Sequence, residues 1–363
     1  VTINLKNSSG SAITTGAVLK YYDSGNWHNA VDNGDGSFTA SVNGNSVMYS
    51  MTYNYTSQTI TSAGNPVDFQ TSATKAVVKN SGNIELTGGT YSFYGIGGWH
   101  YGYASGTSLE LLPGNYSFAM NYNNSGQQKN GQTVSGTSSE IVFTTTTVTP
   151  RLLNCSETED IANSTFTYYG YQGWKASQAT NTSIELLPGN ISFSMTVNGT
   201  SQQTNNIAIS GPSQDIKFYA TLMNYVYSGN ITYYANGWRT LTQGMYLLPG
   251  TYYFKFGNQT FPTFAVSGCE MNGNVNIFIT KQSDGTALPN IPIYRNDYGT
   301  HFQQIGTTDA NGILFKTNLP SPVKTYRASK HYSNQDIVGS ATTFNFQYCR
   351  FISNGNYPDD TPF

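Results

Sequence analysis

The sequence predicts an all-β protein, built as a linear array of small antiparallel immunoglobulin-like β-sandwiches. Aromatic residues make up 14% of the 363 residues, and aromatic side chains pack best in strands. Apolar and polar residues alternate over many short segments, which is the period of a half-buried strand. Three motifs also recur along the chain at similar spacings, which indicates tandem repeats.

The first of these motifs ends in a tryptophan. It occurs as YYDSGNW, FYGIGGW, YYGYQGW and YYANGW, with successive tryptophans 72, 75 and 64 positions apart. The second motif follows the last three tryptophans as LLPGNYSFAM, LLPGNISFSM and LLPGTYYFKF. The third motif, VDFQT, IVFTT or IKFYA, runs directly into the next unit. We therefore predict sandwiches at residues 1–73, 74–147, 148–222 and 223–270, joined without linkers.

The segments between these landmarks are predicted as strands. After the first Leu-Pro-Gly, for example, apolar and polar residues alternate strictly, so Phe118 and the corresponding Phe193 are expected to point into the cores. The Leu-Pro-Gly itself is predicted as a turn, in which Gly supplies the positive φ of a type II turn.

Residues 271–363 break the pattern and are predicted as a different β-sandwich. Their V-x-I…SDGTxLPNxPIY…TTDANG pattern resembles the immunoglobulin-like, prealbumin-like modules of surface adhesins and carboxypeptidase regulatory domains. The first four units resemble the tandem β-sandwich repeats of secreted prokaryotic surface and filament proteins. This resemblance implies a structural or adhesive role and no particular catalytic residues.

Charge and hydropathy exclude several partners. The 17 Lys and Arg against 19 Asp and Glu leave a net charge of -2, which offers no basic field for nucleic acid. No apolar run approaches the length of a membrane span. The chain begins with Val1 rather than Met, which is expected of a secreted, extracellular protein whose signal peptide has been removed, although an artificial start would look the same.

The three cysteines are too few for a disulfide scaffold. We predict one disulfide between Cys269 and Cys349, which would tie the start of the last module to its final strand and leave Cys155 free. Three reduced thiols are the alternative.

The tryptophans admit two interpretations. Rings on loops can stack on sugars, and a basic or imidazole residue follows each of them, so a carbohydrate platform is one possibility; the residues are Trp27, Trp99, Trp174 and Trp238, followed by His28, His100, Lys175 and Arg239. A residue that recurs at the same point of a hairpin is more typical of packing in a core or between units. His28 and His100 are not expected to be catalytic, because Lys and Arg replace them in other units.

No motif of an enzyme, cofactor site or metal site is present. The segment 32–36, DNGDG, has the oxygen density of a calcium loop but lacks the other ligands of an EF-hand. A turn capped by its own Asx side chains explains it equally well. We therefore expect no enzymatic activity, no cofactor and no metal.

Asn-x-Ser/Thr sequons are the remaining candidate sites. The eleven sequons are only slightly more than composition alone predicts; they start at Asn7, Asn54, Asn115, Asn123, Asn154, Asn163, Asn181, Asn190, Asn198, Asn230 and Asn258. Asn54, Asn115 and Asn190 fall on or beside strands, out of phase with the apolar face, where a glycan could be carried. Covalent N-linked glycans are therefore expected, and none of the sequons lies in residues 271–363, which predicts a buried or contacting end there.

Together these features predict an extracellular structural protein, a glycosylated subunit of a cell-surface filament, lattice or adhesin that assembles head-to-tail with itself. The fourth unit is about ten residues short, roughly one strand and a turn, and a missing strand would leave an edge to be filled. Val1, Ile3 and Leu5 form an alternating strand that could fill it in the next copy. Folding of this strand into its own first unit is the alternative.

Overall fold

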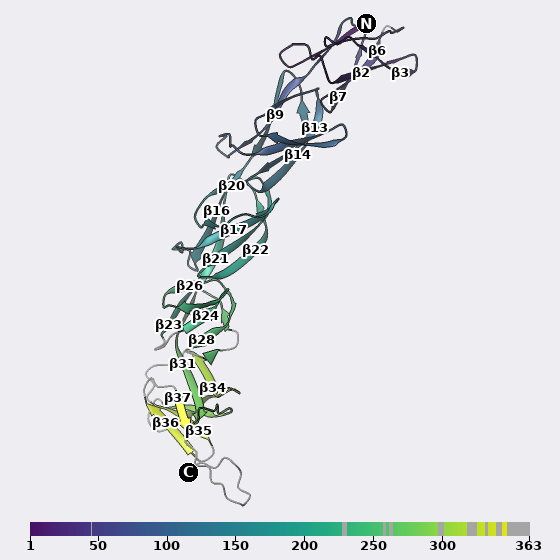
Figure 1. Cartoon of the computed structure of the whole chain (residues 1–363). Coiled ribbons are helices and arrows are strands. Elements are labelled where there is room, and N and C mark those ends of the chain that lie inside the picture. The colour runs from purple at the N-terminus through teal and green to yellow at the C-terminus, as the bar shows by residue number, and fades with distance from the viewer. Residues whose placement is uncertain are drawn as a thin grey trace, which may run out of the picture. The chain divides into compact units, whose positions relative to one another are not determined.

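The computed structural model describes residues 1–44, 46–226, 231–256, 259–260, 264–296, 301–317, 325–330, 333–338 and 343–346. All the regular elements in these ranges are strands (Figure 1), which confirms the predicted all-β class. None of the described segments is a helix that could cross a membrane.

The chain divides into two compact units, and two loops of the third repeat belong to the second of them. The first unit comprises Val1–Leu153, Asp160–Thr196 and Ser201–Phe218, and the second comprises Asn154–Glu159, Val197–Thr200 and Tyr219–Phe363. Below, repeats 1 to 5 denote the sandwiches formed by β1–β8, β9–β15, β16–β23, β23–β31 and β31–β37.

Repeat 2 illustrates the sandwich. One sheet has the order β12 (Ser108–Leu111), β9 (Ser72–Lys79), β15 (Ser138–Thr144). The other has the order β11 (Gly98–Ala104), β10 (Thr90–Gly95), β13 (Gly114–Tyr122), β14 (Ser125–Val134). All neighbouring strands are antiparallel except the first and last of the repeat, β9 and β15, which are parallel.

The core of repeat 2 lies between these two sheets. Phe93, Phe118 and Phe143, one from each of three strands, are fully buried there. Phe193 is equally buried in repeat 3, so the predicted phase of both Leu-Pro-Gly strands is confirmed. A strict period of two is enough to assign this face, because successive side chains of a strand point to opposite sides.

Repeats 1 and 3 have the same two sheets. In repeat 1 one sheet has the order β4 (Val31–Asp32), β5 (Ser37–Thr39), β1 (Thr2–Lys6), β8 (Val67–Gln70). The other has the order β3 (Asn26–Asn29), β2 (Ala17–Asp23), β6 (Val47–Tyr53), β7 (Thr56–Ser62). In repeat 3 one sheet has the order β20 (Ile184–Leu186), β16 (Thr146–Asn154), β23 (Ser213–Val226). The other has the order β18 (Gly173–Trp174), β17 (Thr165–Gly170), β21 (Gly189–Val197), β22 (Thr200–Ile209), and β19 (Gln178–Ala179) also pairs with β17.

Repeats 4 and 5 share strands with their neighbours in sequence. In repeat 4 β23 lies between β26 (Met245–Leu247) and β31 (Glu270–Gln282). A second sheet has the order β25 (Trp238–Leu241), β24 (Ile231–Tyr234), β28 (Phe254–Phe256), β29 (Gln259–Thr260), and β27 (Gly250–Tyr252) pairs with β30 (Phe264–Val266). In repeat 5 β31 lies between β34 (Ile313–Thr317) and β37 (Thr343–Phe346). The other sheet has the order β33 (Gln303–Thr307), β32 (Pro292–Asn296), β35 (Thr325–Lys330), β36 (Ser333–Val338). The described strands of repeat 5 thus follow the order of repeat 2, although a different sandwich was expected there.

Repeat 4 does not lack its closing strand, which corrects the expectation from the tryptophan spacing. The end of β23 pairs in parallel with the start of β31, from Leu222↔Glu270 to Val226↔Asn274. Four positions of sequence separate β23 from β24, where ten separate the first two strands of repeats 1, 2 and 3, at 7–16, 80–89 and 155–164.

The N-terminal strand is part of its own repeat, so the prediction that Val1, Ile3 and Leu5 are donated to another copy is corrected. β1 pairs with β5 through Ile3↔Phe38 and with β8 through Leu5↔Phe69. Ile3 and Leu5 are fully buried, and Val1 packs against the same core. Withdrawing the strand would open that core to water, which is the physical reason for the internal pairing.

The glycines of the Leu-Pro-Gly turns act differently from the prediction. Gly189 has a φ of 156°, far from the type II value, and Gly114 and Gly250 are not among the described residues with positive φ. A Cβ on Gly114 would lie 2.9 Å from the hydroxyl oxygen of Tyr116, and one on Gly250 would lie 2.9 Å from that of Tyr252. At these two positions glycine makes room for a tyrosine.

Candidate functional site

The feature that recurs most regularly is a set of contacts at each of three repeat junctions. Its centre is a two-residue hairpin turn followed by Ser or Thr, at residues 54–56, 123–125 and 198–200, here called the junction turns. Each turn begins with Asn at positive φ, 44° for Asn54, 44° for Asn123 and 50° for Asn198, and the next residue is also at positive φ. Two successive positive φ values define a type I′ hairpin, for which Asn is a preferred first residue.

The Asn side chain of each junction turn reaches the following repeat. Its Nδ2 donates to the main-chain oxygen of the residue that lies three positions before the Pro of Leu-Pro-Gly. The pairs are Asn54–Glu110 at 3.0 Å, Asn123–Glu185 at 3.1 Å and Asn198–Tyr246 at 2.9 Å. The same interaction therefore occurs at three successive junctions.

The hydroxyl of each junction turn makes a second link. Thr56, Ser125 and Thr200 are 0%, 1% and 1% exposed. Each hydroxyl accepts the main-chain N–H of the second Leu of Leu-Leu-Pro-Gly; the partners are Leu112 at 3.0 Å, Leu187 at 2.7 Å and Leu248 at 3.0 Å. Each also donates within its own hairpin at 2.7 Å, to Tyr53, Tyr122 or Val197. Each of these hydroxyls therefore both donates and accepts a hydrogen bond.

The leucine at this position belongs to the core of the preceding repeat. Leu112 is fully buried in the cluster that contains Ile3 and Phe69 of repeat 1. Leu187 is fully buried in the cluster that contains Phe118 of repeat 2. Successive repeats in the first unit therefore share part of their cores.

The backbones also approach closely at the first two junctions. The N–H of Ile96 donates to the oxygen of Tyr55 at 2.6 Å, and that of Tyr171 donates to the oxygen of Asn124 at 2.9 Å. The preceding residues are Gly95 and Gly170, and a Cβ on Gly170 would lie 1.9 Å from the oxygen of Asn124. Glycine is needed here because no other residue fits.

Two tyrosines extend the contact from the next repeat. The hydroxyl of Tyr168 donates to Asn123, 2.8 Å from its Oδ1 and 3.1 Å from its main-chain oxygen, and that of Tyr233 donates to the oxygen of Asn198 at 2.5 Å. Burial raises the pKa of Tyr168 to about 12 and also raises the pKa of Tyr233. Both hydroxyls therefore stay protonated, and able to donate, at neutral pH.

A carboxylate reinforces the first two junctions. Glu110 accepts from the hydroxyl of Ser8 at 2.6 Å, from the N–H of Ser8 at 2.9 Å, and from the hydroxyl of Thr71. Glu185 accepts from the hydroxyl of Thr147 at 2.6 Å and from that of Thr145. Tyr246 stands at this position in repeat 4.

A disulfide lies at the third junction, between Cys155 and Cys269. The predicted disulfide between Cys269 and Cys349 and the predicted free thiol of Cys155 are therefore wrong. Cys349 lies outside the described residues. Cys155 directly follows Asn154 in the connection between the first two strands of repeat 3, as Ser8 follows Asn7 in repeat 1. The Cα atoms of Cys155 and Cys269 are 4.8 Å apart across 114 positions of sequence, a proximity that no local pattern contains.

Three of the four tryptophans are exposed and Trp99 is half-buried, which corrects the core part of the expectation that they pack in a core or between units. Trp27, Trp174 and Trp238 are 47%, 48% and 41% exposed. Each of the four packs on the Tyr that is the second aromatic residue of its motif, with ring centroids 5.4–5.6 Å apart, in the pairs Tyr22–Trp27, Tyr94–Trp99, Tyr169–Trp174 and Tyr234–Trp238. These pairs are directly opposite on adjacent strands, where aromatic pairs stabilise a sheet.

In repeats 2 and 4 the basic residue after the tryptophan does not extend this aromatic surface. Successive residues of a strand point to opposite faces. The ring of His100 accordingly stacks on Tyr55 of repeat 1, with centroids 3.7 Å apart, and Nε of Arg239 donates to the oxygen of Ala235 at 3.1 Å. His100 is therefore a junction residue, which the sequence did not indicate.

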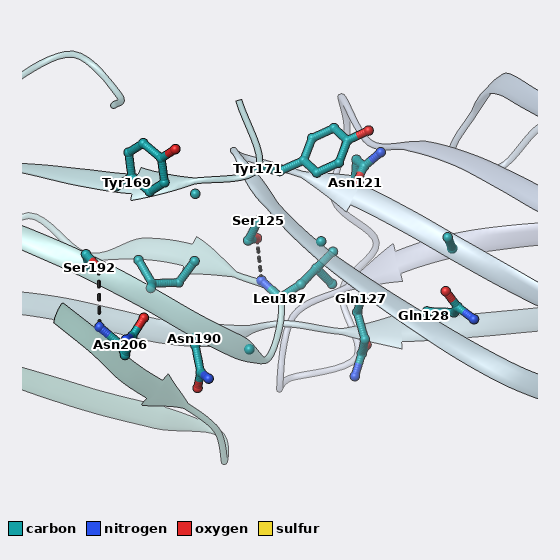
Figure 2. Close-up of a pocket in the computed structure, with 15 residues that line it drawn as sticks. Asn121, Ser125, Gln127, Gln128, Tyr169, Tyr171, Leu187, Asn190, Ser192 and Asn206 are labelled. Atoms are coloured by element: carbon teal, nitrogen blue, oxygen red, sulfur yellow. Dashed lines mark hydrogen bonds between the residues drawn. The ribbon is translucent and has the colours of Figure 1, made fainter. Parts of the chain in front are cut away.

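A shallow groove of about 480 Å³ lies beside the second junction. Figure 2 shows the rings of Tyr169 and Tyr171 along one side of it and the amides of Asn190 and Asn206 along the other. None of its fifteen lining residues is charged. Such a lining offers aromatic faces and amide groups to a neutral polar ligand.

The other predicted sequons have different surroundings. Asn115, Asn163, Asn181 and Asn190 are exposed. Asn7 and Asn154 are half-buried and cap their own turns, since Oδ1 of Asn7 accepts from the N–H of Ser11 at 2.8 Å and Oδ1 of Asn154 accepts from that of Thr158 at 3.0 Å. Asn230 and Asn258 lie outside the described residues.

The segment 32–36 forms Asx turns. Oδ1 of Asp32 accepts from the N–H of Gly34 at 2.8 Å, and Oδ1 of Asp35 accepts from the N–H of Ser37 at 2.9 Å. The hydrogen bonds from Ser37 lower the pKa of Asp35. Within the described ranges no three His, Cys, Asp or Glu side chains gather in a way that could hold a metal ion.

Comparison with known proteins gives only distant similarities. No protein-family model matches the chain, and no curated protein is similar enough to match. The Bacillus anthracis TIE protein is 14% identical over 60% of this chain, with a TM-score of 0.18, and this chain spans about half of it, 49%. The Streptococcal ancillary pilin and BcpA, the major pilin subunit of Bacillus cereus, are 8% and 9% identical over 76% of this chain and 98% of theirs, with TM-scores of 0.19 and 0.18. Similarities of this size assign the chain to no family.

Proposed function

We propose that this chain is an extracellular structural protein, a glycosylated subunit of a cell-surface filament, lattice or adhesin that associates head-to-tail with itself. The observation that carries the proposal is the repeated junction: at three places a hairpin turn of one sandwich is held by the Leu-Leu-Pro-Gly segment of the next. Junctions of this kind resist bending and separation of neighbouring domains, which a load-bearing surface protein needs.

Two further features support an extracellular location. A disulfide between Cys155 and Cys269 forms and persists in oxidising surroundings. The chain also has only 10% charged residues, so its solubility depends on amides, hydroxyls and attached glycans, which salt and pH affect little.

The proposal is tested on native protein in two steps. Mild protease treatment of intact cells should release fragments of this chain, with a known intracellular protein as the control for lysis. Negative-stain microscopy of the purified protein should then show filaments, ordered arrays or strings of domains. Protection of the chain from protease until the cells are broken would contradict the surface location, and single dispersed particles at all concentrations would contradict self-association.

A second candidate function is the binding of a neutral saccharide. It is favoured by the uncharged groove beside Tyr169 and Tyr171 and by the exposed ring of Trp174 next to Tyr169. Quenching of tryptophan fluorescence by a neutral solute cannot separate the two functions, since Trp27, Trp174 and Trp238 are half-exposed in either case. A shift of the tryptophan emission on titration with neutral oligosaccharides separates the two functions. The shift should disappear in Trp174→Phe but persist in Trp27→Phe.

A further inference from the structure

The described sequons fall into three structural groups. In the three sequons of the junction turns the Asn and the hydroxyl both hold the next repeat, in two others Asn7 and Asn154 are half-buried and cap their own turns, and in the remaining four the Asn is exposed on a strand or loop. We infer that Asn54, Asn123 and Asn198 stay unmodified in the folded protein and that Asn115, Asn163 and Asn190 carry the N-linked glycans. This inference rests on the proposed glycosylation and names its sites.

The chemistry of glycan attachment makes the side-chain nitrogen decisive. Transfer forms a bond between Nδ2 of Asn and the anomeric carbon of the sugar, breaks the bond from that carbon to the phosphate of an activated glycosyl donor, and releases one proton from Nδ2. At the junction turns Nδ2 already donates to a main-chain oxygen of the next repeat, at 3.0, 3.1 and 2.9 Å. A sugar on this nitrogen would stand where the following repeat packs.

The third residue of each junction sequon is equally unavailable. Its hydroxyl is at most 1% exposed in Thr56, Ser125 and Thr200, and it both donates and accepts inside the junction. A transferase needs the whole tripeptide, so the turn would have to leave the junction before it could be bound. Asn198 itself is more exposed than Asn54 and Asn123, but its Thr200 is as buried as theirs.

The exposed sequons have no such constraint. Asn115 and Asn190 stand at equivalent positions, directly after the Gly of Leu-Pro-Gly at the start of β13 and β21, and both are exposed. The hydroxyl of Thr133 donates to Oδ1 of Asn115 at 2.9 Å, which engages the oxygen and not the nitrogen. Asn163 is exposed in the connection before β17.

Asn181 is exposed as well but is not assigned to the carriers. Its side chain hydrogen bonds to Asp160, which helps Arg151 to lower the pKa of that carboxyl. The presence of a sequon in the junction turns has its own explanation, because a type I′ hairpin favours Asn at its first position and the buried acceptor requires Ser or Thr.

Glycopeptide mapping of the intact native chain tests the assignment. We expect glycans on Asn115, Asn163 and Asn190 and unmodified peptides for Asn54, Asn123 and Asn198. A glycan on any of the last three overturns the inference while leaving the proposed glycoprotein intact. Unmodified peptides throughout overturn both the inference and the glycan part of the proposed function, but not the structural role, which the microscopy tests separately.

A matched pair of variants tests the junction sequons against the exposed ones in the native host. Asn115→Asp removes an exposed sequon, so we expect the mass to fall by one glycan and the Tm to stay within about 2 °C of the unchanged chain. Asn123→Asp removes a sequon and a junction donor, so we expect an unchanged glycan mass and a Tm lower by about 4–8 °C, as for one lost hydrogen bond in a domain of this size. Asn123→Gly, which also tolerates positive φ, removes both the Nδ2 donor and the Oδ1 that accepts from Tyr168, so its Tm should fall at least as far as that of Asn123→Asp. The opposite pattern of mass and Tm overturns the inference.

Discussion

The main-chain N–H of Leu187 donates to the hydroxyl of Ser125 at 2.7 Å, across 62 positions of sequence and across the boundary between repeats 2 and 3. The leucine side chain lies in the core of repeat 2, while Leu187 itself lies in the turn between β20 and β21 of repeat 3. Repeats 1 and 2 are therefore each completed by a leucine of the next repeat, and the stability of each depends on its successor.

Replacing the hydroxyl at this junction should destabilise both repeats. Ser125→Ala leaves the buried N–H of Leu187 without an acceptor, and we expect the free energy of unfolding to fall by about 1–3 kcal/mol. Ser125→Thr is the matched control, because Thr occupies this position in the other two junction turns. Unfolding in denaturant measures the change, and equal stability of Ser125→Ala and the unchanged chain would contradict the role of the hydroxyl.

Leu187→Ala should weaken repeat 2, although Leu187 belongs to repeat 3 in sequence. Loss of a fully buried leucine costs about 2–5 kcal/mol, close to the about 3–5 kcal/mol expected for Phe118→Ala in the same core. Hydrogen exchange should accelerate in β10 and β13 in both variants. Ile84→Ala, at a position that is 65% exposed, is the control and should change exchange little. Acceleration confined to repeat 3 in Leu187→Ala would show that the leucine does not share the core of repeat 2.

The disulfide should stabilise the second unit. Cys155→Ser opens a covalent loop of 114 positions, and we expect the free energy of unfolding to fall by about 2–4 kcal/mol. Cys349→Ser is the control and should leave stability unchanged. Peptide mapping without reduction should recover the peptides of Cys155 and Cys269 linked; a linked pair of Cys269 and Cys349 would restore the prediction from sequence.

Stability should decline at high pH, in part through Tyr168. Its folded pKa of about 12 lies above the value of about 10 in an unfolded chain. A raised folded pKa contributes stability that is complete below pH ~10 and is lost as the pH rises towards 12. Tyr168→Phe removes this dependence, and Phe fits because Phe93 holds the equivalent position in repeat 2. We expect the Tm of the unchanged chain to approach that of the variant between pH 9 and pH ~11; parallel Tm curves would exclude Tyr168 as the titrating group.

The junction turns show what sequence patterns contained but did not reveal. N-Y-T, N-N-S and N-G-T each follow an apolar alternating strand at the same distance. Their recurrence was a signal of a structural role. A sequon has the same letters whether its Asn carries a sugar or closes a hairpin, so the motif alone could not separate the two roles, and Asn54 was expected to carry a glycan.

The sequence by itself determined the strands and the direction of their side chains. Phe118 and Phe193 could be placed in cores because a strand has a period of two, which is a local property of the backbone. Only the tertiary structure decided which core received Leu187, which cysteine paired with Cys269, and that Ile3 and Leu5 closed their own repeat. These contacts join residues 35 to 114 positions apart, and their energies depend on the burial and hydrogen bonding that arise only when separate strands come together.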